Sequence, residues 1–265
     1  MINLFANPPL YPFLGEKFQH TKIPAFLGKE TSFPSPEKNV ESNLLNYYLL
    51  DAASILPVEA LNITDEDDFI LDVCAAPGGK TLAIAQHVYL ARKQKNSDAS
   101  TVSLTCNEPS PDRNKRLYNV TKSYIGKGLN VTVSRYDATN INSFIGGSFD
   151  KILVDAPCSS DRHLIQKGEP IAKSCSKTVK KQRQLLLNAL EWLRPGGRLV
   201  YATCSLNPRE NDEVVGYVLK KYKESVKVVR PNMPIGEKTN FGWLMLPDKC
   251  EGFGPLYFAT IVKDE

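Results

Sequence analysis

The feature that most constrains the fold is the alternation of apolar, strand-length segments with helical segments. Strands that alternate with helices are typical of a parallel sheet with helices on both faces. We therefore expect an α/β, doubly wound fold. The expected strands are 69–74, 101–108, 129–138, 149–157, 198–205, 225–230 and 256–263. The expected helices are 81–94, 110–125, 177–193 and 209–222, the second opened by a serine cap with a proline in its first turn.

The part of the chain before these segments differs in character. Residues 1–42 are rich in proline and aromatic residues and show neither a helical nor a strand period, so we expect an irregular N-terminal extension. Residues 43–265 form the expected main domain. Its first element is predicted as a helix over 42–61, with Pro57 as a kink or stop near the end. No apolar run approaches the roughly 20 residues that a membrane helix needs, so no membrane association is expected.

The six cysteines indicate neither a metal site nor a disulfide framework. None of them forms a C-x-x-C pair, and the three histidines are scattered along the chain. No secretory signal is visible, so the thiols are expected to be reduced. Cys106 lies within an expected strand and is interpreted as a core residue.

The segment "LDVCAAPGGKT" lies where the first strand of the sheet turns into a helix. Open α/β sheets bind their ligands at such turns. Gly78 and Gly79 allow close approach of the backbone, and the helix N-terminus offers unpaired N–H groups. The segment matches neither the dinucleotide fingerprint nor the P-loop fingerprint. It therefore predicts a ligand loop of another kind.

Acidic residues end the next two strands. Glu108 can accept hydrogen bonds from ribose hydroxyls, although an acid just before a helix is also favoured by the helix dipole. Asp137 suits a contact near an adenine, and equally suits an Asx-turn. A glycine-containing loop and two acids on one sheet edge together predict a site for S-adenosylmethionine.

The fourth and fifth strands end in "VDAPCSS" and "TCSLNP", which bring Asp155, Cys158 and Cys204 to the same edge. Methylation of carbon 5 of a pyrimidine needs such groups, because that carbon is not nucleophilic. A thiolate must first add to carbon 6, while an acid such as Asp155 stabilises the ring at nitrogen 3. Transfer to an exocyclic nitrogen would use a motif such as D-P-P-Y, which Ala156 and Cys158 interrupt.

The segments "CAAPGGK", "DAPCS" and "ATCSL…EN" together resemble the Sun/RsmB family of RNA 5-methylcytosine methyltransferases, over roughly residues 42–265. The resemblance implies a Rossmann-like class I methyltransferase domain over 43–265, with a mixed seven-stranded sheet. It implies Cys204 as nucleophile and Cys158 as the residue that assists adduct breakdown, whereas DNA cytosine enzymes use the thiol of the fourth strand for attack. The implied S-adenosylmethionine site comprises Cys74, Ala75, Ala76, Pro77, Gly78, Gly79, Lys80, Glu108, Arg113, Asp137 and Asp155.

Further segments resemble the mitochondrial branch of this family, which acts on small-subunit ribosomal RNA or on transfer RNA. These are "NYYLLDAASILPV", "SSDRH" and "GFGPLYFA". The resemblance implies an RNA substrate, with ribosomal RNA favoured over transfer RNA. It implies a mitochondrial location, although the first 29 residues make a poor transit peptide, and the alternatives are cytoplasm and nucleus. A non-catalytic RNA-binding assembly factor and a methyltransferase acting on exocyclic nitrogen are the rival functions.

Basic residues concentrate between Lys167 and Arg183, where six cations face only one acid. The stretch suits a solvated loop and helix face, and equally a patch that contacts RNA phosphates at the mouth of the site. We expect the second. Such contacts position a substrate without reading its sequence. The choice of cytosine is therefore expected to come from RNA shape or from a protein partner.

Overall fold

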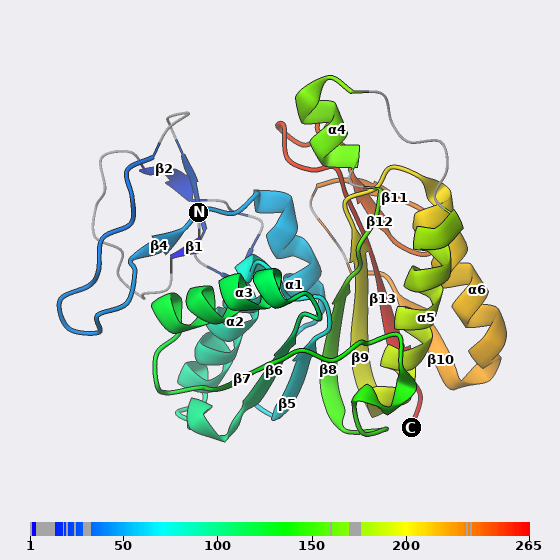
Figure 1. The fold of residues 1–265 in the computed structure, drawn as a ribbon, viewed down its shortest axis with the longest axis horizontal. Helices are drawn as coiled ribbons and strands as arrows, with labels where there is room; N and C mark the ends of the chain where they lie inside the picture. The colour runs from blue at the N-terminus through cyan, green and yellow to red at the C-terminus, as the bar shows by residue number, and fades with distance from the viewer. Residues whose placement is uncertain are drawn as a thin grey trace.

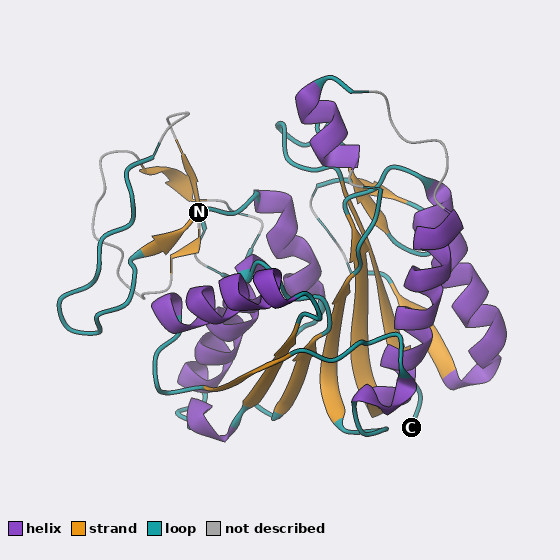
Figure 2. Cartoon of the chain, viewed as in Figure 1, coloured by secondary structure: helices purple, strands orange, loops and turns teal. Residues whose placement is uncertain are grey.

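The computed structural model describes residues 2–3, 14–17, 19, 21–23, 25–28, 33–159, 161–169, 176–231, 233 and 235–265. Its centre is a mixed β-sheet with helices on both faces (Figures 1 and 2). The sheet order is β11-β12-β13-β9-β8-β5-β6-β7, and β10 also pairs with β13. The strands are β5 (Phe69–Asp72), β6 (Ser103–Asn107), β7 (Asn130–Ser134), β8 (Phe149–Asp155), β9 (Leu193–Thr203), β10 (Val226–Val229), β11 (Glu237–Lys238), β12 (Trp243–Met245) and β13 (Leu256–Lys263).

The strand pairing confirms the expected doubly wound α/β arrangement. Strands β5 to β9 pair in parallel, whereas β10 to β13 pair with antiparallel partners. All seven expected strands are present. The described part of the chain adds β11 and β12, so its sheet has nine strands rather than seven. These two strands are only two and three residues long, which is too short for a periodic sequence pattern.

Helices cover the two faces of the sheet through separate apolar clusters. Most buried apolar residues of α1, α2 and α3 share a cluster with Ile70 of β5, whereas those of α5 and α6 share a cluster with Leu71. Successive strand residues point to opposite faces, so one strand serves both clusters. No described helix is both long and apolar enough to cross a membrane. The helices are α1 (Leu56–Ala60), α2 (Gly79–Gln94), α3 (Pro111–Tyr124), α4 (Asp161–Lys167), α5 (Ser176–Trp192) and α6 (Asp212–Tyr222).

The prediction of one continuous helix over 42–61 is wrong. Within this range β4 (Tyr47–Tyr48) pairs with β1 (Ile2–Asn3), and a 3-10 helix (Ala52–Ile55) precedes the short α1. The Asp51 carboxylate accepts the Ala53 N–H at 2.9 Å, so it caps a helix start instead of continuing a helix. Pro57 stands in the first turn of α1, where the missing N–H costs nothing. It therefore begins the helix rather than ending it.

The N-terminal extension is less irregular than expected. Besides β1 it contains β2 (Leu14–Lys17) and β3 (Phe26–Gly28), which pair with each other. Ile23 is fully buried in the cluster of α1 and α2, and its N–H donates to Glu59 of α1 at 3.0 Å. The extension is thus packed on the main domain. The boundary at residue 42 stays a prediction.

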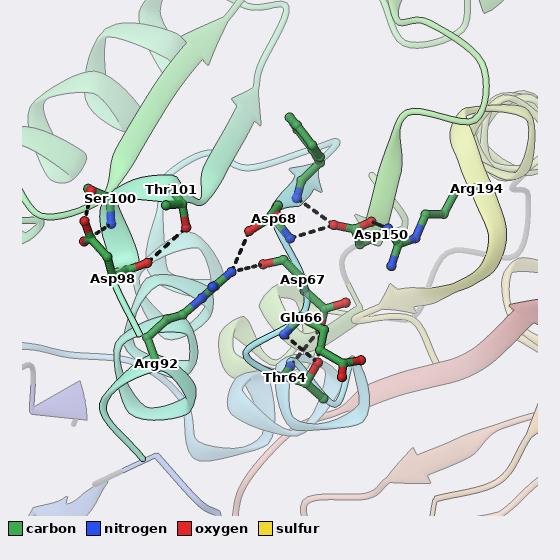
Figure 3. A network of polar contacts seen from close by, with 11 residues as sticks. Thr64, Glu66, Asp67, Asp68, Arg92, Asp98, Ser100, Thr101, Asp150 and Arg194 are labelled. Carbon is green, nitrogen blue, oxygen red and sulfur yellow. Dashed lines mark hydrogen bonds and ion pairs between the residues drawn. The ribbon is translucent and has the colours of Figure 1, made fainter. Parts of the chain in front are cut away.

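A polar network ties the loop before β5 to neighbouring elements at the amino ends of the strands (Figure 3). Asp150, only 1% exposed, accepts the N–H groups of Asp68 and Phe69 at 2.7 Å and pairs with Arg194 at 2.5 Å. From α2, Arg92 reaches Asp68 at 2.6 Å. Buried charge here is matched by hydrogen bonds, which fixes this edge of the sheet. The candidate site lies at the opposite edge of the sheet, at the carboxyl ends of the strands.

Candidate functional site

A cavity of about 480 Å³, here the strand-end cavity, opens at the carboxyl ends of the parallel strands. Strand order reverses beside β5, with β6 on one side and β8 on the other, and ligands bind at such a switch point. Every strand from β5 to β9 contributes residues that follow its carboxyl end. The lining residues are Val73, Cys74, Ala76, Lys80, Glu108, Pro109, Arg113, Asp137, Ala138, Asp155, Ala156, Pro157, Cys158, Lys181, Leu185, Cys204 and Leu256.

The loop between β5 and α2 contributes only part of its predicted set. Cys74, Ala76 and Lys80 line the strand-end cavity. The other loop residues of the predicted set do not line this cavity; they are Ala75, Pro77, Gly78 and Gly79. Burial raises the pKa of the Cys74 thiol far above its ordinary value, with nearby carboxylates adding to the effect. The high pKa favours a neutral Cys74 thiol where this residue lines the cavity.

The two loop glycines lie close to side chains of other elements. Gly78 has a φ of +121°, and a Cβ there would lie 2.7 Å from Cγ1 of Val120 on α3. A Cβ on Gly79 would lie 2.7 Å from Cδ1 of Leu50. The glycines thus allow close approach of α3 and of the segment after β4. Close approach to a ligand stays a prediction.

Glu108 and Arg113 lie next to each other in the lining of the strand-end cavity. Glu108 is 3% exposed, accepts the Ser110 N–H at 3.0 Å and pairs with Arg113 at 3.3 Å. Arg113 also donates to the Ala76 carbonyl at 2.9 Å, so it joins α3 to the loop after β5. Ser110 occupies the expected N-cap position of α3, with a proline in the first turn, but its side chain makes no capping hydrogen bond.

Asp137 forms the Asx-turn considered from the sequence, and its contact near an adenine stays a prediction. Its Oδ1 accepts the Thr139 N–H at 3.0 Å and the Thr139 hydroxyl at 2.8 Å, which is an Asx-turn. These bonds lower the pKa of Asp137, the backbone bond contributing most. Asp137 also lines the strand-end cavity. The turn holds an ionised carboxylate at the cavity wall.

Asp155 lies at the end of β8 and forms an ion pair with Lys80, with Nζ and Oδ2 2.7 Å apart. Asp155 pairs in register with Ala202 of β9, and the Ala156 N–H donates to the Ala202 carbonyl at 2.8 Å. This register brings the loop after β8 beside the loop after β9. As a result, the Sγ atoms of Cys158 and Cys204 lie 3.1 Å apart in the cavity.

Two fully buried carboxylates hold these two loops together, and the sequence interpretation gave them no role. Glu210 accepts the Ser159 N–H at 3.1 Å and the Ser205 hydroxyl at 2.6 Å. Asp161, at the start of α4, accepts the Ser205 hydroxyl at 3.0 Å and the Leu206 N–H at 2.8 Å. Both lie within the family-like segments of the sequence, "SSDRH" and the "EN" of the last motif, so a signal was present.

The basic stretch divides over two faces of α5. Lys181 lines the strand-end cavity, together with Leu185 one turn later, as expected for a stretch at the mouth of the site. Lys180 lies on another face, where it lines a separate cavity with Arg183. Lys173 lies outside the described residues. Among the described residues of the stretch, Lys180 and Lys181 therefore line different cavities.

Known proteins resemble this chain in sequence and in structure. The family model described as 16S rRNA methyltransferase RsmB/F matches residues 58–261. A mitochondrial tRNA (cytosine(34)-C(5))-methyltransferase of Danio rerio is 35% identical over 83% of this chain and 61% of its own length. The 5-cytosine rRNA methyltransferase NSUN4 of Mus musculus is 34% identical over 88% of this chain and 64% of its own. The chain thus spans somewhat over three fifths of these relatives.

Solved structures of methyltransferases also resemble this chain. A crystal structure of NSun6 from Pyrococcus horikoshii with SFG superposes with a TM-score of 0.68 and 28% identity, over 83% of this chain and 54% of that one. A methyltransferase homologue from the same organism gives 0.63 and 28%, over 82% and 68%. The family and fold expected from the sequence motifs are confirmed. The chain belongs to the 16S rRNA methyltransferase RsmB/F family.

Proposed function

We propose that this chain is an S-adenosylmethionine-dependent RNA methyltransferase that acts on carbon 5 of cytosine through a covalent intermediate. The observation that carries the proposal is the pair of thiols, Cys158 and Cys204, with Sγ atoms 3.1 Å apart. Both line the cavity that holds the Lys80–Asp155 ion pair. Membership of a family of RNA methyltransferases supports it.

The strand-end cavity suits S-adenosylmethionine in size and in donor chemistry. Its volume of about 480 Å³ is that of a small-molecule site. The nearly buried Glu108 carboxylate fits ribose hydroxyls, and Asp137 fits the polar edge of an adenine. Asp155, Arg113 and the backbone between Cys74 and Lys80 complete the proposed site. The bound molecule would supply a methyl group on a positively charged sulfur.

The chain's own groups would activate the base. Cys204, as a thiolate, adds to carbon 6 of the cytosine, and the proton that it gave up reaches nitrogen 3 through Asp155. Carbon 5 becomes nucleophilic and accepts the methyl group. Cys158, as a thiolate, then takes the proton of carbon 5. The double bond between carbons 5 and 6 re-forms as the Cys204 sulfur leaves with the electrons of its bond to carbon 6, and nitrogen 3 returns its proton to Asp155. In this proposal the Cys204 thiolate attacks the base, and Cys158 assists release of the methylated base.

The substrate is proposed to be small-subunit ribosomal RNA, with transfer RNA as the second candidate. The matching family and the mouse relative carry names of ribosomal RNA enzymes, whereas the zebrafish relative is named for cytosine 34 of transfer RNA. The zebrafish relative is also named as mitochondrial, which supports a mitochondrial location for this chain. We further propose that a protein partner or the folded RNA selects the cytosine.

The test is methyl transfer by the purified chain from labelled S-adenosylmethionine to transcribed small-subunit ribosomal RNA and transfer RNA. Bisulfite sequencing then locates 5-methylcytosine, and the same RNAs containing 5-fluorocytidine should trap a covalent protein–RNA adduct. Transfer without an adduct would indicate an exocyclic-nitrogen enzyme. Cofactor and RNA binding without transfer would indicate an assembly factor.

A further inference from the structure

A second cavity, here the α5–α6 groove, lies between the two helices on the other face of α5 from the strand-end cavity. Its volume is about 360 Å³. Three of the residues that line it are cations, Lys180, Arg183 and Arg209, and none is a carboxylate. The nearest acid along α6, Glu213, lines a neighbouring cavity that shares Arg183 and Tyr217 with the groove. The groove is therefore basic and suits a polyanion.

An aromatic ring stands at the edge of the groove. Tyr217 of α6 is 44% exposed, and the guanidinium carbon of Arg183 lies 4.5 Å from its ring centroid. Nε of Arg183 is buried and has no hydrogen-bond partner among the described residues. Exposed aromatic rings and guanidinium planes are the surfaces on which unpaired bases stack. A simple phosphate-binding patch would not need the ring.

The groove adjoins the reacting groups through two connections. Lys180 lines the groove, while the next residue, Lys181, lines the strand-end cavity. Arg209 follows Cys204 by five residues, and its neighbour Glu210 accepts the Ser159 N–H of the other cysteine loop. A strand with its cytosine at the thiols can therefore continue into the groove.

We propose that the α5–α6 groove binds nucleotides that flank the target cytosine in single-stranded RNA. Lys180 and Arg209 contact phosphates, and a base stacks on Tyr217 beside Arg183. The inference rests on the proposed function, since it names how RNA is held beside the same site. The experiments that test this inference measure RNA binding. The inference can therefore fail even where methyl transfer is observed.

The phosphate-binding role is tested with Lys180→Gln combined with Arg209→Gln. The matched control is Lys93→Gln combined with Lys95→Gln, two exposed lysines at the far end of α2. Binding of a fluorescent single-stranded RNA with the target cytosine at its centre is measured over a salt series. The groove variant should flatten the log–log salt dependence by about 0.7 for each phosphate that the protein no longer neutralises, and the control should not. Equal slopes for the two variants would overturn the proposal.

The stacking role of the ring is tested separately. Tyr217→Ala should weaken binding of this RNA by about tenfold, while Tyr217→Phe, which keeps the ring, should bind nearly as wild type. A cytidine mononucleotide, which has no flanking base to stack on the ring, should not distinguish the variants. Thermal melting verifies that each variant is folded. Unchanged affinity of Tyr217→Ala for the longer RNA would exclude stacking, and the groove would then be left to a protein partner.

Discussion

Nζ of Lys80 lies 2.7 Å from Oδ2 of Asp155, so the first turn of α2 is joined to the carboxyl end of β8. The ion pair fixes the carboxylate between the loop of the proposed methyl donor and the thiol of Cys158. Asp155→Asn keeps the shape but cannot carry a proton. We expect methyl transfer to fall by at least about a hundredfold, with little change in melting temperature.

The control for this variant is Asp248→Asn, which removes an exposed carboxylate outside the cavity. Turnover and thermal melting are measured for both. A drop in melting temperature of Asp155→Asn that accounts for its lower rate would assign Asp155 a scaffold role.

Cys204→Ala is expected to abolish both methyl transfer and adduct formation. Cys204 follows β9, whereas the loop of the proposed cofactor site follows β5, so S-adenosylmethionine should bind nearly as tightly as to wild type. Calorimetric titration measures the binding, and a denaturing gel with 5-fluorocytidine RNA measures the adduct. Substantial turnover by the variant would disprove the nucleophile assignment.

Cys158→Ala should give the opposite result, a protein–RNA adduct that accumulates on unmodified RNA. Attack by Cys204 survives, but the thiol 3.1 Å away that takes the proton is gone. The adduct is followed on a denaturing gel over time. If Cys158→Ala forms no adduct while Cys204→Ala does, the roles of the two thiols are exchanged, as in the DNA enzymes.

Glu210→Ala should lower the free energy of unfolding by about 3 kcal/mol and misplace both cysteine loops. The fully buried carboxylate accepts from Ser159, Gln182 and Ser205, and these donors would be left without their acceptor. Urea denaturation measures the change. Glu213→Ala, an exposed site on α6, should stay within about 0.5 kcal/mol of wild type. Equal stabilities would show that the loops hold their geometry without Glu210.

The parts of the fold that could be predicted are those whose sequence pattern matches their burial. β8 is buried over the first six of its seven residues, and Phe149 and the run 152–154 within it are apolar, as in a strand covered on both faces. The segment around Tyr47 could not be predicted, because its strand partner is β1, more than forty residues earlier. The pairing of β4 with β1 overrides the local helix propensity there, and no local sequence pattern encodes that pairing.

The candidate site likewise has parts that the sequence predicts and parts that it does not predict. Strand ends meet at one edge of a parallel sheet, so the positions of Glu108, Asp137, Asp155 and the two thiols followed from strand assignment. The contribution of Lys181 depends on the rotation of α5 about its axis, and the supporting role of Glu210 depends on how a loop folds back. Neither is fixed by the order of elements.

Asp72 provides a pH test of the loop after β5. The side chain is fully buried at the end of β5 and accepts the Thr81 hydroxyl at 2.7 Å. Burial, with a smaller effect of the Asp155 charge, raises its pKa from 3.8 to about 7. The folded protein therefore binds a proton that the unfolded chain has released between these values. Stability should fall as pH rises from about 4 to about 7, by a few kcal/mol from this group.

Asp72→Asn keeps an acceptor for Thr81 but cannot ionise, so its unfolding free energy should vary less with pH over this window. Wild type and variant are compared by urea denaturation at several pH values, since other groups titrate equally in both. The difference between the two curves isolates Asp72, and its slope should be that of one proton, about 1.4 kcal/mol per pH unit at most. Parallel curves would mean that Asp72 ionises in the folded protein at its ordinary pKa, with Lys80 near enough to offset its burial.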